Sequence, residues 1–289
     1  MRVFVTGGSG FVGSHIVDKS VKSGYEVFNY DLKVDKRLDI LKPEVLQSEI
    51  QRFEPDVIYH CAGQVFLAPG EEDPVRDNRL NAVSMIYLCK AIEGTDVSMV
   101  FTSTGAVYGL SGLPHREDMR CLPVCNYGVS KLMAEEYLRK WVATEGVNAK
   151  IVRFSSVYGG KRKAGPVNMF LEQAAKGGPI KVFGSGNQTR DFVHIDDVVR
   201  GLEMVHERGA RGEVYNIGTG VETSVNQVAQ LVKLKHYPEL EIEFVPGKGS
   251  IYDLPRSWFD VTKAASLGFK AKVDLEFGIA LTRNDMEKE

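Results

Sequence analysis

Short apolar runs alternate with longer amphipathic stretches along the first half of the chain. The runs are rich in β-branched residues, and we expect strands at residues 2–6, 26–30, 57–61, 98–102 and 149–154. Between them apolar residues recur every three to four positions, and we expect helices at residues 10–23, 43–53, 81–92 and 127–144. Strands that alternate with helices predict parallel βαβ units, and therefore an α/β protein with a doubly wound parallel sheet.

The alternation loosens beyond residue 158. Short helices are expected at residues 167–176, 195–207 and 224–235, and short strands at residues 180–183, 214–217 and 241–245. We interpret this part as a smaller C-terminal α/β lobe that covers the carboxyl edge of the sheet, where such folds bind their ligands. The chain thus divides into a domain at residues 1–158 and a lobe at residues 159–289, and we expect it to cross between them more than once.

The charge balance excludes some partners. The 289 residues include 36 Lys and Arg against 38 Asp and Glu, a net charge of −2. This balance gives no general attraction to nucleic acid or to an anionic membrane. No run approaches the ~18 apolar residues of a membrane span, and no secretory signal is expected at the N-terminus. We therefore expect neither nucleic acid nor membrane as a partner.

The cysteines are expected to be free thiols. Cys61, Cys89, Cys121 and Cys125 suit a reducing compartment, and we expect a cytoplasmic protein. Cys121 and Cys125 lie near His115, but this spacing lacks the second ligand pair of a zinc site. No metal is expected.

A glycine-rich turn joins the first expected strand to the first expected helix. Residues 6–13 read Thr-Gly-Gly-Ser-Gly-Phe-Val-Gly. Gly7 permits a tight turn, Gly10 lets the backbone approach a pyrophosphate, and Gly13 lets the helix pack closely on the strand. The helix N-terminus then offers N–H groups and a positive dipole end to phosphates. The pattern favours a Rossmann-type dinucleotide site over a plain strand-to-helix turn.

Asp31 strengthens this interpretation. It follows the second expected strand, 18 residues after Gly13, where a carboxylate accepts hydrogen bonds from both ribose hydroxyls of an adenosine. A carboxylate there repels a 2′-phosphate, so NAD is favoured over NADP. The nearby cations Lys33, Lys36 and Arg37 keep NADP as the alternative.

A tyrosine and a lysine are placed to exchange a proton with a substrate. Tyr127 and Lys131 are four residues apart and share one face of an expected helix. A tyrosine with its ordinary pKa of about 10 is a poor base at neutral pH, but an adjacent ammonium and a nicotinamide cation stabilise the phenolate. Thr104, at the end of an earlier strand, is placed to bridge the substrate oxygen and the tyrosine. An ordinary surface pair is the alternative.

Taken together, these segments resemble the extended short-chain dehydrogenases/reductases, and among them the nucleotide-sugar epimerases and dehydratases. The resemblance covers nearly the whole chain, and residues 190–197, Arg-Asp-Phe-Val-His-Ile-Asp-Asp, are its most specific part. It is carried by residues 7–13, Asp39 and Ile40, residues 60–64, Asn81, residues 103–109, Tyr127 and Lys131, and residues 153–159, 182–184, 189–198 and 215–220.

The resemblance implies two sets of binding residues. It implies an NAD site made by Gly7, Gly10, Phe11, Val12, Gly13, Asp31, Asp39, Ile40, Cys61, Ala62, Gly63, Gln64, Asn81, Ser103, Tyr127, Lys131 and Ser155. It implies a nucleotide-sugar site, in the C-terminal lobe and at its border with the sheet, made by Thr104, Tyr127, Ser156, Val167, Val182, Phe183, Arg190, Asp253, Arg256 and Ser257. Within these sets, Thr104, Tyr127 and Lys131 are implied to be catalytic, and Arg190 to pair with the substrate diphosphate.

The helices at 81–92 and 127–144 resemble those that form a four-helix interface in homodimers of the family. The second carries Met133, Tyr137, Leu138 and Trp141 at helical spacing. These apolar side chains fit either such an interface or packing within one chain.

The residues after Thr104 separate the subfamilies. The dehydratases that the chain resembles carry an acid directly after the catalytic hydroxyl, and the related UDP-glucuronate decarboxylases have a Glu in this segment. Here Gly105 and Ala106 follow Thr104, and neither can move a proton. The chain is most similar to 4-epimerases, which interconvert UDP-glucose and UDP-galactose through a 4-keto sugar and need a single base. A nucleotide-sugar 4-ketoreductase and a non-catalytic NAD-binding regulator are the alternatives.

Three serines depart from the epimerase pattern. Ser156 stands where an Asn is usual, and Ser250 where a second diphosphate-binding Arg is usual, which Lys248 or Arg256 is expected to replace. Ser257 stands at the position that limits the size of the sugar, and a small residue there would admit N-acetyl sugars.

Overall fold

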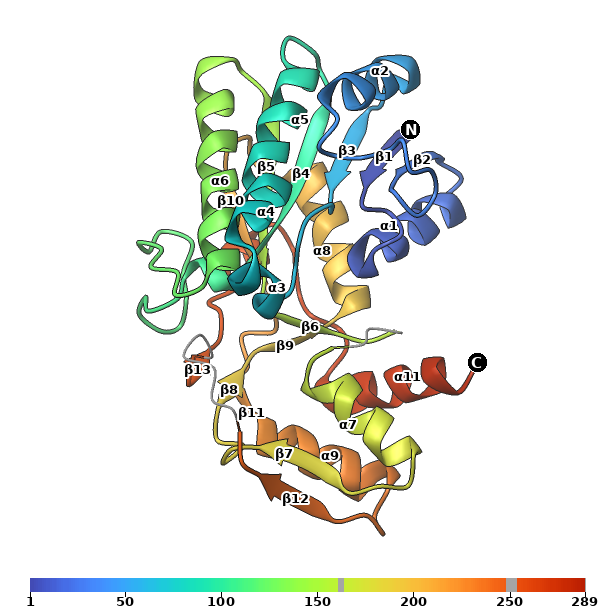
Figure 1. Cartoon of the computed structure of the whole chain (residues 1–289), viewed down its shortest axis with the longest axis vertical. Helices are drawn as coiled ribbons and strands as arrows, with labels where there is room; N and C mark the ends of the chain where they lie inside the picture. The colour runs from blue at the N-terminus through green and yellow to red at the C-terminus, as the bar shows by residue number, and fades with distance from the viewer. Residues whose placement is uncertain (161–163, 248–253, 289) are drawn as a thin grey trace.

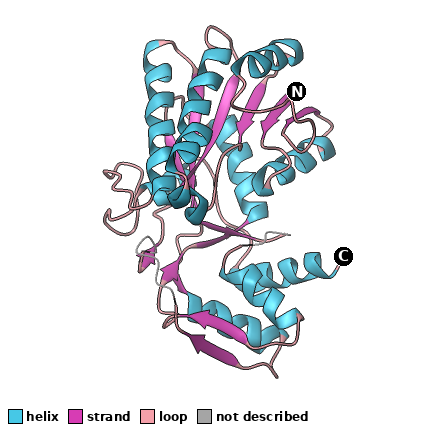
Figure 2. Cartoon of the chain, in the orientation of Figure 1, coloured by secondary structure: helices cyan, strands magenta, loops and turns pink. Residues whose placement is uncertain are grey.

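A six-stranded parallel sheet, covered by helices on both faces, forms the larger part of the molecule (Figure 1, Figure 2). The computed structural model describes residues 1–160, 164–247 and 254–288. The sheet has the order β10-β5-β4-β3-β1-β2. Its strands are β1 (Arg2–Thr6), β2 (Glu26–Tyr30), β3 (Val57–His60), β4 (Ser98–Thr104), β5 (Asn148–Phe154) and β10 (Val214–Ile217). The doubly wound α/β fold expected from the sequence is confirmed.

Alternate residues of each strand enter two separate apolar cores. Phe4, Ile58 and Phe101 belong to one core, and their neighbours Val5, Tyr59 and Val100 belong to the other. The first core is closed by α2 (Pro43–Phe53), α5 (Ser84–Ile92) and α6 (Asn126–Thr144). The second is closed by α1 (Phe11–Lys22), α8 (Ile195–Arg208) and α10 (Thr262–Ser266). Burial on both faces explains why these strands are apolar runs without alternation.

The chain crosses between the two parts of the molecule. Strand β10 lies beyond residue 158, yet it pairs with β5 in the sheet, with Val214 opposite Ile151. Helix α8 also lies beyond residue 158 and packs on the sheet. Residues 1–158 alone therefore do not complete the sheet and its helical cover.

A smaller lobe lies below the carboxyl edge of the sheet in Figure 1. Its core joins α7 (Pro166–Ala175), α9 (Val225–His236), α11 (Leu275–Glu287) and the parallel pair of β7 (Ile180–Phe183) and β12 (Ile242–Val245). Short strands connect it to the larger part: β6 (Ser156–Tyr158), β8 (Thr189–Arg190), β9 (Phe192–His194), β11 (Thr223–Ser224) and β13 (Arg256–Ser257). Strands of two or three residues are too short to show a hydrophobic period, and the sequence pattern predicts none of these five.

The helix expected at residues 81–92 has a different form. It is preceded by α3 (Leu67–Glu72) and α4 (Pro74–Asn78), and a π-helical turn at Arg79–Val83 comes before α5. Asn81 lies in this turn, and its buried side-chain amide donates to Ser130 Oγ at 2.9 Å. The π-turn is a local insertion of the type that often marks a functional site.

A buried ion pair joins α6 to the sheet. Arg153 of β5 donates to both carboxylate oxygens of Glu135 of α6, at 3.0 and 2.6 Å, and both side chains are almost completely buried. Ser103 of β4 donates to the same carboxylate at 2.5 Å. The guanidinium also lies over the ring of Tyr108, 4.7 Å from its centre. One carboxylate thus connects a helix with two strands.

We expect Arg153→Met to lower the free energy of unfolding by about 3–5 kcal/mol, because it leaves the Glu135 carboxylate buried without its cation. Denaturant unfolding of nucleotide-free protein measures this. Arg139→Met is the control: Arg139 lies 3.4 Å from the same carboxylate but its side chain is 39% exposed, so the loss should stay below about 1 kcal/mol. Equal losses in the two variants would contradict this account.

Candidate active site

A cleft of about 1250 Å³ runs between the carboxyl edge of the sheet and the smaller lobe. Residues from both parts line it, among them Gly10 of the glycine turn, Tyr127 of α6 and Arg190 of β8. The position follows from the topology, because the strand order reverses between β1 and β3 and the connections diverge there. The cleft is therefore where a doubly wound fold binds a nucleotide.

The glycine turn has no room for side chains at two positions. A Cβ on Gly13 would lie 2.2 Å from the Gly7 carbonyl oxygen, and one on Gly7 would lie 2.7 Å from the Ala62 backbone nitrogen. Gly7 also has a φ of +68°, which favours glycine. Helix α1 begins directly after Gly10, which lines the cleft. Because Gly10 has no side chain, the backbone at the start of the helix is open to the cleft. The backbone there forms a cradle that fits a pyrophosphate.

Asp31 is fixed at the rim of this cradle. Its carboxylate accepts from the backbone N–H groups of Ser9, at 3.0 Å, and Lys33, at 2.8 Å. The Lys33 ammonium donates to the Ser9 carbonyl at 3.3 Å. The carboxylate is thus oriented by backbone, and it lines the cleft next to the position of an adenosine ribose. Asp39 and Ile40 line the same end of the cleft.

The other end of the cradle holds a polar atom without a protein partner. Ser155 Oγ is buried and has no hydrogen-bond partner among the described residues, although Ser155 lines the cleft. Cys61, Ala62 and Gly63 line the cleft at the end of β3. An unsatisfied buried hydroxyl is unusual, and a ligand in the cleft would satisfy it. The residues present fit a dinucleotide.

Lys131 is a buried cation at the cleft. It is only 4% exposed, and its ammonium lies 4.2 Å from the centre of the Phe101 ring. Burial lowers the pKa of Lys131 to about 8, while Cys61, Glu135 and Asp77 oppose this shift. Burial and the Lys131 charge lower the pKa of the neighbouring His60 to about 3, so this imidazole is neutral. Lys131 therefore titrates close to physiological pH.

Hydrogen bonds hold the first turns of α6. Ser130 Oγ bonds Asp77 and lies 3.1 Å from the Tyr127 carbonyl oxygen. Asn81 accepts from the Gln64 backbone N–H at 3.1 Å and so ties the loop after β3 to the same network. Gln64 and Asn81 stand behind the cleft wall and do not line it.

The end of β4 supplies the expected hydroxyl. Thr104 lines the cleft, and its Oγ1 accepts from the Ala106 N–H at 3.2 Å, which fixes the rotamer at the start of a 3₁₀ turn, Gly105–Val107. Ser103 also lines the cleft, but its hydroxyl donates to Glu135. Ser103 therefore positions the strand end in this structure.

Part of the expected substrate set reaches the cleft. Ser156, Val167, Arg190 and Ser257 line it. Strand β13 pairs with β8 so that Ser257 lies opposite Arg190 and Arg256 opposite Thr189. Because successive residues of a strand point to opposite faces, Arg256 faces away from the cleft.

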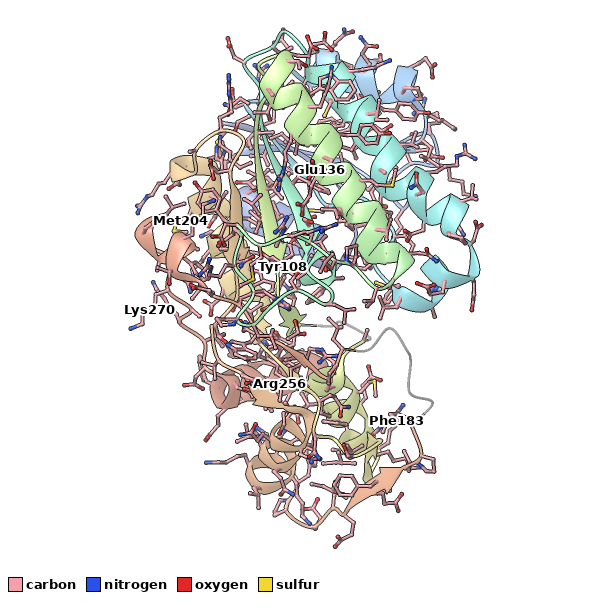
Figure 3. The ribbon with its side chains drawn as sticks, turned by 90° about the vertical axis from the view of Figure 1, so that its left-hand side faces the viewer. Tyr108, Glu136, Phe183, Met204, Arg256 and Lys270 are labelled. Atoms are coloured by element: carbon pink, nitrogen blue, oxygen red, sulfur yellow. The ribbon has the colours of Figure 1, made fainter. Side chains whose placement is uncertain are left out.

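Three expected substrate residues lie elsewhere, and one is not described. Arg256 forms two hydrogen bonds of 2.7 Å with Glu222 instead of facing a diphosphate. Val182 is completely buried in the core of the smaller lobe, and Phe183, 51% exposed, lies outside the cleft (Figure 3). Asp253 lies outside the described residues, as do Lys248 and Ser250.

The sequence missed several residues of the cleft wall. The apolar segment Val65, Phe66 and Leu67 lines it between β3 and α3, and Leu80 and Phe259 line it elsewhere. No motif marks these positions. The only signal in the sequence is that residues 65–67 are three consecutive apolar residues.

Two of the cysteines, Cys61 and Cys125, are a buried thiol and a helix cap. Burial raises the pKa of Cys61 to about 12, so its thiol is not nucleophilic at neutral pH. Cys125 Sγ accepts from the Gly128 N–H at 3.3 Å and caps α6. Among the described residues, no three His, Cys, Asp or Glu side chains are grouped to hold a metal.

Fold and site together define a Rossmann-type enzyme with a dinucleotide cleft, and Tyr127 and Lys131 of α6 line this cleft. The chain belongs to the NAD dependent epimerase/dehydratase family, whose sequence profile matches residues 3–218. Its cofactor is NAD, as expected from Asp31.

Relatives span the whole chain. A protein of Methanocaldococcus jannaschii named putative UDP-glucose 4-epimerase is 34% identical over 99% of this chain and 98% of its own length. The UDP-glucose 4-epimerase of Mycolicibacterium smegmatis is 31% identical over 98% of this chain and 97% of its own. The structure of UDP-glucose 4-epimerase with UDP-glucose from Thermotoga maritima has a TM-score of 0.92 at 32% identity and covers 100% of this chain and 99% of that one.

We expect Lys131→Met to raise the free energy of unfolding of the nucleotide-free protein at pH 7 while it abolishes activity. A pKa lowered from 10.5 to about 8 corresponds to a burial penalty of up to roughly 3 kcal/mol. Between pH 8 and 10.5 only the unfolded chain retains this proton, so the penalty fades as the pH rises. Denaturant unfolding at pH 7 and 10.5 should show a gain that disappears at the higher pH.

The exposed Lys140 provides the control for this measurement. Its side chain is 50% exposed, and Lys140→Met should change stability by less than about 1 kcal/mol at either pH. A gain in Lys131→Met that persists at pH 10.5 would contradict a burial penalty on the charge.

We expect Asp31→Ser to weaken NAD binding at least tenfold and to narrow the preference over NADP, because it removes the ribose acceptor and the repulsion of a 2′-phosphate. Calorimetric titration of nucleotide-free protein with each cofactor measures both. Asp35→Ser removes the same charge from a carboxylate that bonds Arg37 and does not line the cleft, so it should change neither affinity. An unchanged ratio in Asp31→Ser would refute the assignment.

Proposed function

We propose that this protein is an isomerase, an NAD-dependent 4-epimerase that interconverts UDP-glucose and UDP-galactose and also admits their N-acetyl forms. The observation that supports it best is that Tyr127 and Lys131 line the cleft, whereas Gly105 and Ala106, the two residues after Thr104, carry no acid. An acid at position 105 would require a shift of its surroundings, because a Cβ on Gly105 would lie 2.8 Å from the ring of the buried Phe259. Loss of water or of carboxylate needs such a second proton donor or acceptor, whereas exchange at C4 does not.

The chain's own residues perform the proton chemistry. When bound, NAD supplies a reversible hydride acceptor for C4 of the sugar. Tyr127 takes the proton of the 4-hydroxyl and returns it to the opposite epimer, and Thr104 orients that oxygen. Lys131 stabilises the phenolate, and its burial next to the Phe101 ring strengthens this effect because little water screens its charge. We assign the ribose contact of the cofactor to the same ammonium.

The substrate lies along the smaller lobe in this proposal. Arg190 pairs with the diphosphate, for which a guanidinium fork is suited. Ser257 lies opposite Arg190 on the neighbouring strand, and we assign to this small side chain the admission of an acetamido group. Ser156 donates to the diphosphate where its hydroxyl enters the cleft. The names of the relatives support UDP as the nucleotide.

We also propose a cytoplasmic homodimer formed through α5 and α6, which lie side by side (Figure 1). On α6, Leu138 and Trp141 are buried within the chain, whereas Val129 and Met133 are exposed. The exposed pair supplies an apolar strip for a second copy. Within the described part of the chain, no helix combines the length and the apolar character needed to cross a bilayer.

The test is incubation of the purified protein with UDP-galactose, without added cofactor, followed by proton NMR of the anomeric region. Appearance of UDP-glucose establishes an epimerase that carries its own NAD. If only UDP-N-acetylgalactosamine is converted, the reaction is the proposed epimerisation and the substrate is the N-acetyl sugar. A loss of NADH or NADPH absorbance at 340 nm when a 4-keto sugar is added, without epimerisation, would favour the ketoreductase. NAD binding with no turnover of any nucleotide sugar would favour a regulator.

We expect Tyr127→Phe to reduce turnover at least a thousandfold while NAD stays bound, because the variant loses the phenol that exchanges the proton and keeps the cofactor cradle. Turnover by NMR and the nucleotide content of the denatured protein check the two statements. Tyr137→Phe makes the same change on the same helix outside the cleft, and it should retain wild-type activity. Turnover near the wild-type rate in Tyr127→Phe would refute the mechanism.

A further inference from the structure

The first turn of α6 is held by a carboxylate from another element. Glu71 of α3 accepts from the backbone N–H of Asn126 at 2.7 Å and from its side-chain amide at 2.9 Å. Asn126 is the first residue of α6 and directly precedes Tyr127. No pattern along the chain predicts this contact, because the two residues are 55 positions apart.

A carboxylate is well suited to this place. The first N–H groups of a helix lack intrahelical acceptors, and the dipole favours a negative charge at that end. The local cap, Cys125, contributes a sulfur at 3.3 Å from the Gly128 N–H, and sulfur is a weak acceptor. Glu71 therefore supplies the strong, charge-assisted contact at this helix end.

The same short helix connects the tyrosine to the cleft wall. Helix α3 begins at Leu67, the last residue of the apolar segment Val65–Leu67 that lines the cleft. At its other end, a Cβ on Gly70 would lie 3.0 Å from the Asp77 carboxylate, which in turn bonds Ser130 of α6. Helix α3 thus contacts α6 through Glu71, before Tyr127, and lies close to Asp77 of α4, which bonds α6 after Tyr127.

We propose that Glu71 is a positioning residue for Tyr127: by holding Asn126, it sets the tyrosine relative to the sugar and keeps the apolar segment of the cleft wall against the same helix. The inference rests on the proposed function of Tyr127 as the base. Substrate affinity depends mainly on Arg190 and the smaller lobe, so release of α6 should affect the reaction step more than binding. A misplacement of about 1 Å at a reacting group costs on the order of a hundredfold.

The test compares three variants in steady-state epimerisation of UDP-galactose. Glu71→Ala should lower kcat 10- to 100-fold, with KM within threefold and NAD affinity within twofold of the wild type. Glu71→Gln keeps an acceptor for the Asn126 N–H and should recover most of kcat. Glu72→Ala removes an equal charge from the exposed neighbouring residue of the same helix and should behave as the wild type.

Amide hydrogen exchange makes the result independent of turnover. Glu71→Ala should speed exchange at residues 126–129 at least tenfold, and Glu72→Ala should not. If the wild-type protein epimerises none of the sugars, the proposed function fails, and faster exchange in Glu71→Ala would still establish the anchor. If the wild type is active and Glu71→Ala has unchanged kcat and unchanged exchange, the positioning role is refuted.

Variants of milder effect guard against a folding defect. If Glu71→Ala unfolds, Asn126→Ala removes only the side-chain half of the contact and should lower kcat two- to fivefold at an unchanged KM. A loss of kcat in either variant that is matched by a rise in KM and a loss of NAD binding would show a general structural effect and overturn the proposal. A loss of equal size in Glu72→Ala would overturn it as well.

Discussion

The buried contact of Glu135 with Arg153 is the interaction on which the site's geometry depends. Glu135 lies one helical turn after Lys131, Arg153 lies near the carboxyl end of β5, and Ser103 belongs to the strand that ends in Thr104. Arg153 and Ser103 share the Glu135 carboxylate, so the helix that carries the base is tied to the strand that carries the orienting hydroxyl. A buried ion pair contributes uncertain net stability, but it tolerates few alternative arrangements of its neighbours.

Burial also tunes the charges around this contact. Lys131 and His60 lie next to the same ring, Phe101, and water is excluded from both. The imidazole is neutral, so it does not compete with the ammonium for the tyrosine. Asp77 and Glu135 are close enough to oppose the loss of the lysine proton. The ammonium is therefore kept at neutral pH by two carboxylates that are themselves bonded to other groups.

The sequence predicts those parts of the molecule whose determinants are local. The glycine turn, Asp31 and the Tyr127–Lys131 spacing each depend on a few consecutive positions, and the structure brings them together at one cleft. Val182 and Phe183 fail as cleft residues because strand alternation sends one into the lobe's core and the other to solvent. Two other features join residues that are distant in the chain: Glu71 bonds Asn126, and Phe259 lies close to Gly105. No pattern along the sequence predicts such contacts.

The position of β10 has a consequence for the order of assembly. When residues 1–158 have left the ribosome, five strands are available, and β5 has an unpaired edge until residue 217 follows. An open apolar edge strand is a template for pairing with other chains. Helix α7 and strand β7 of the smaller lobe are synthesised in that interval, so the edge of β5 stays open while the second part of the molecule begins to form. Synthesis that stalls in the smaller lobe would leave an aggregation-prone intermediate.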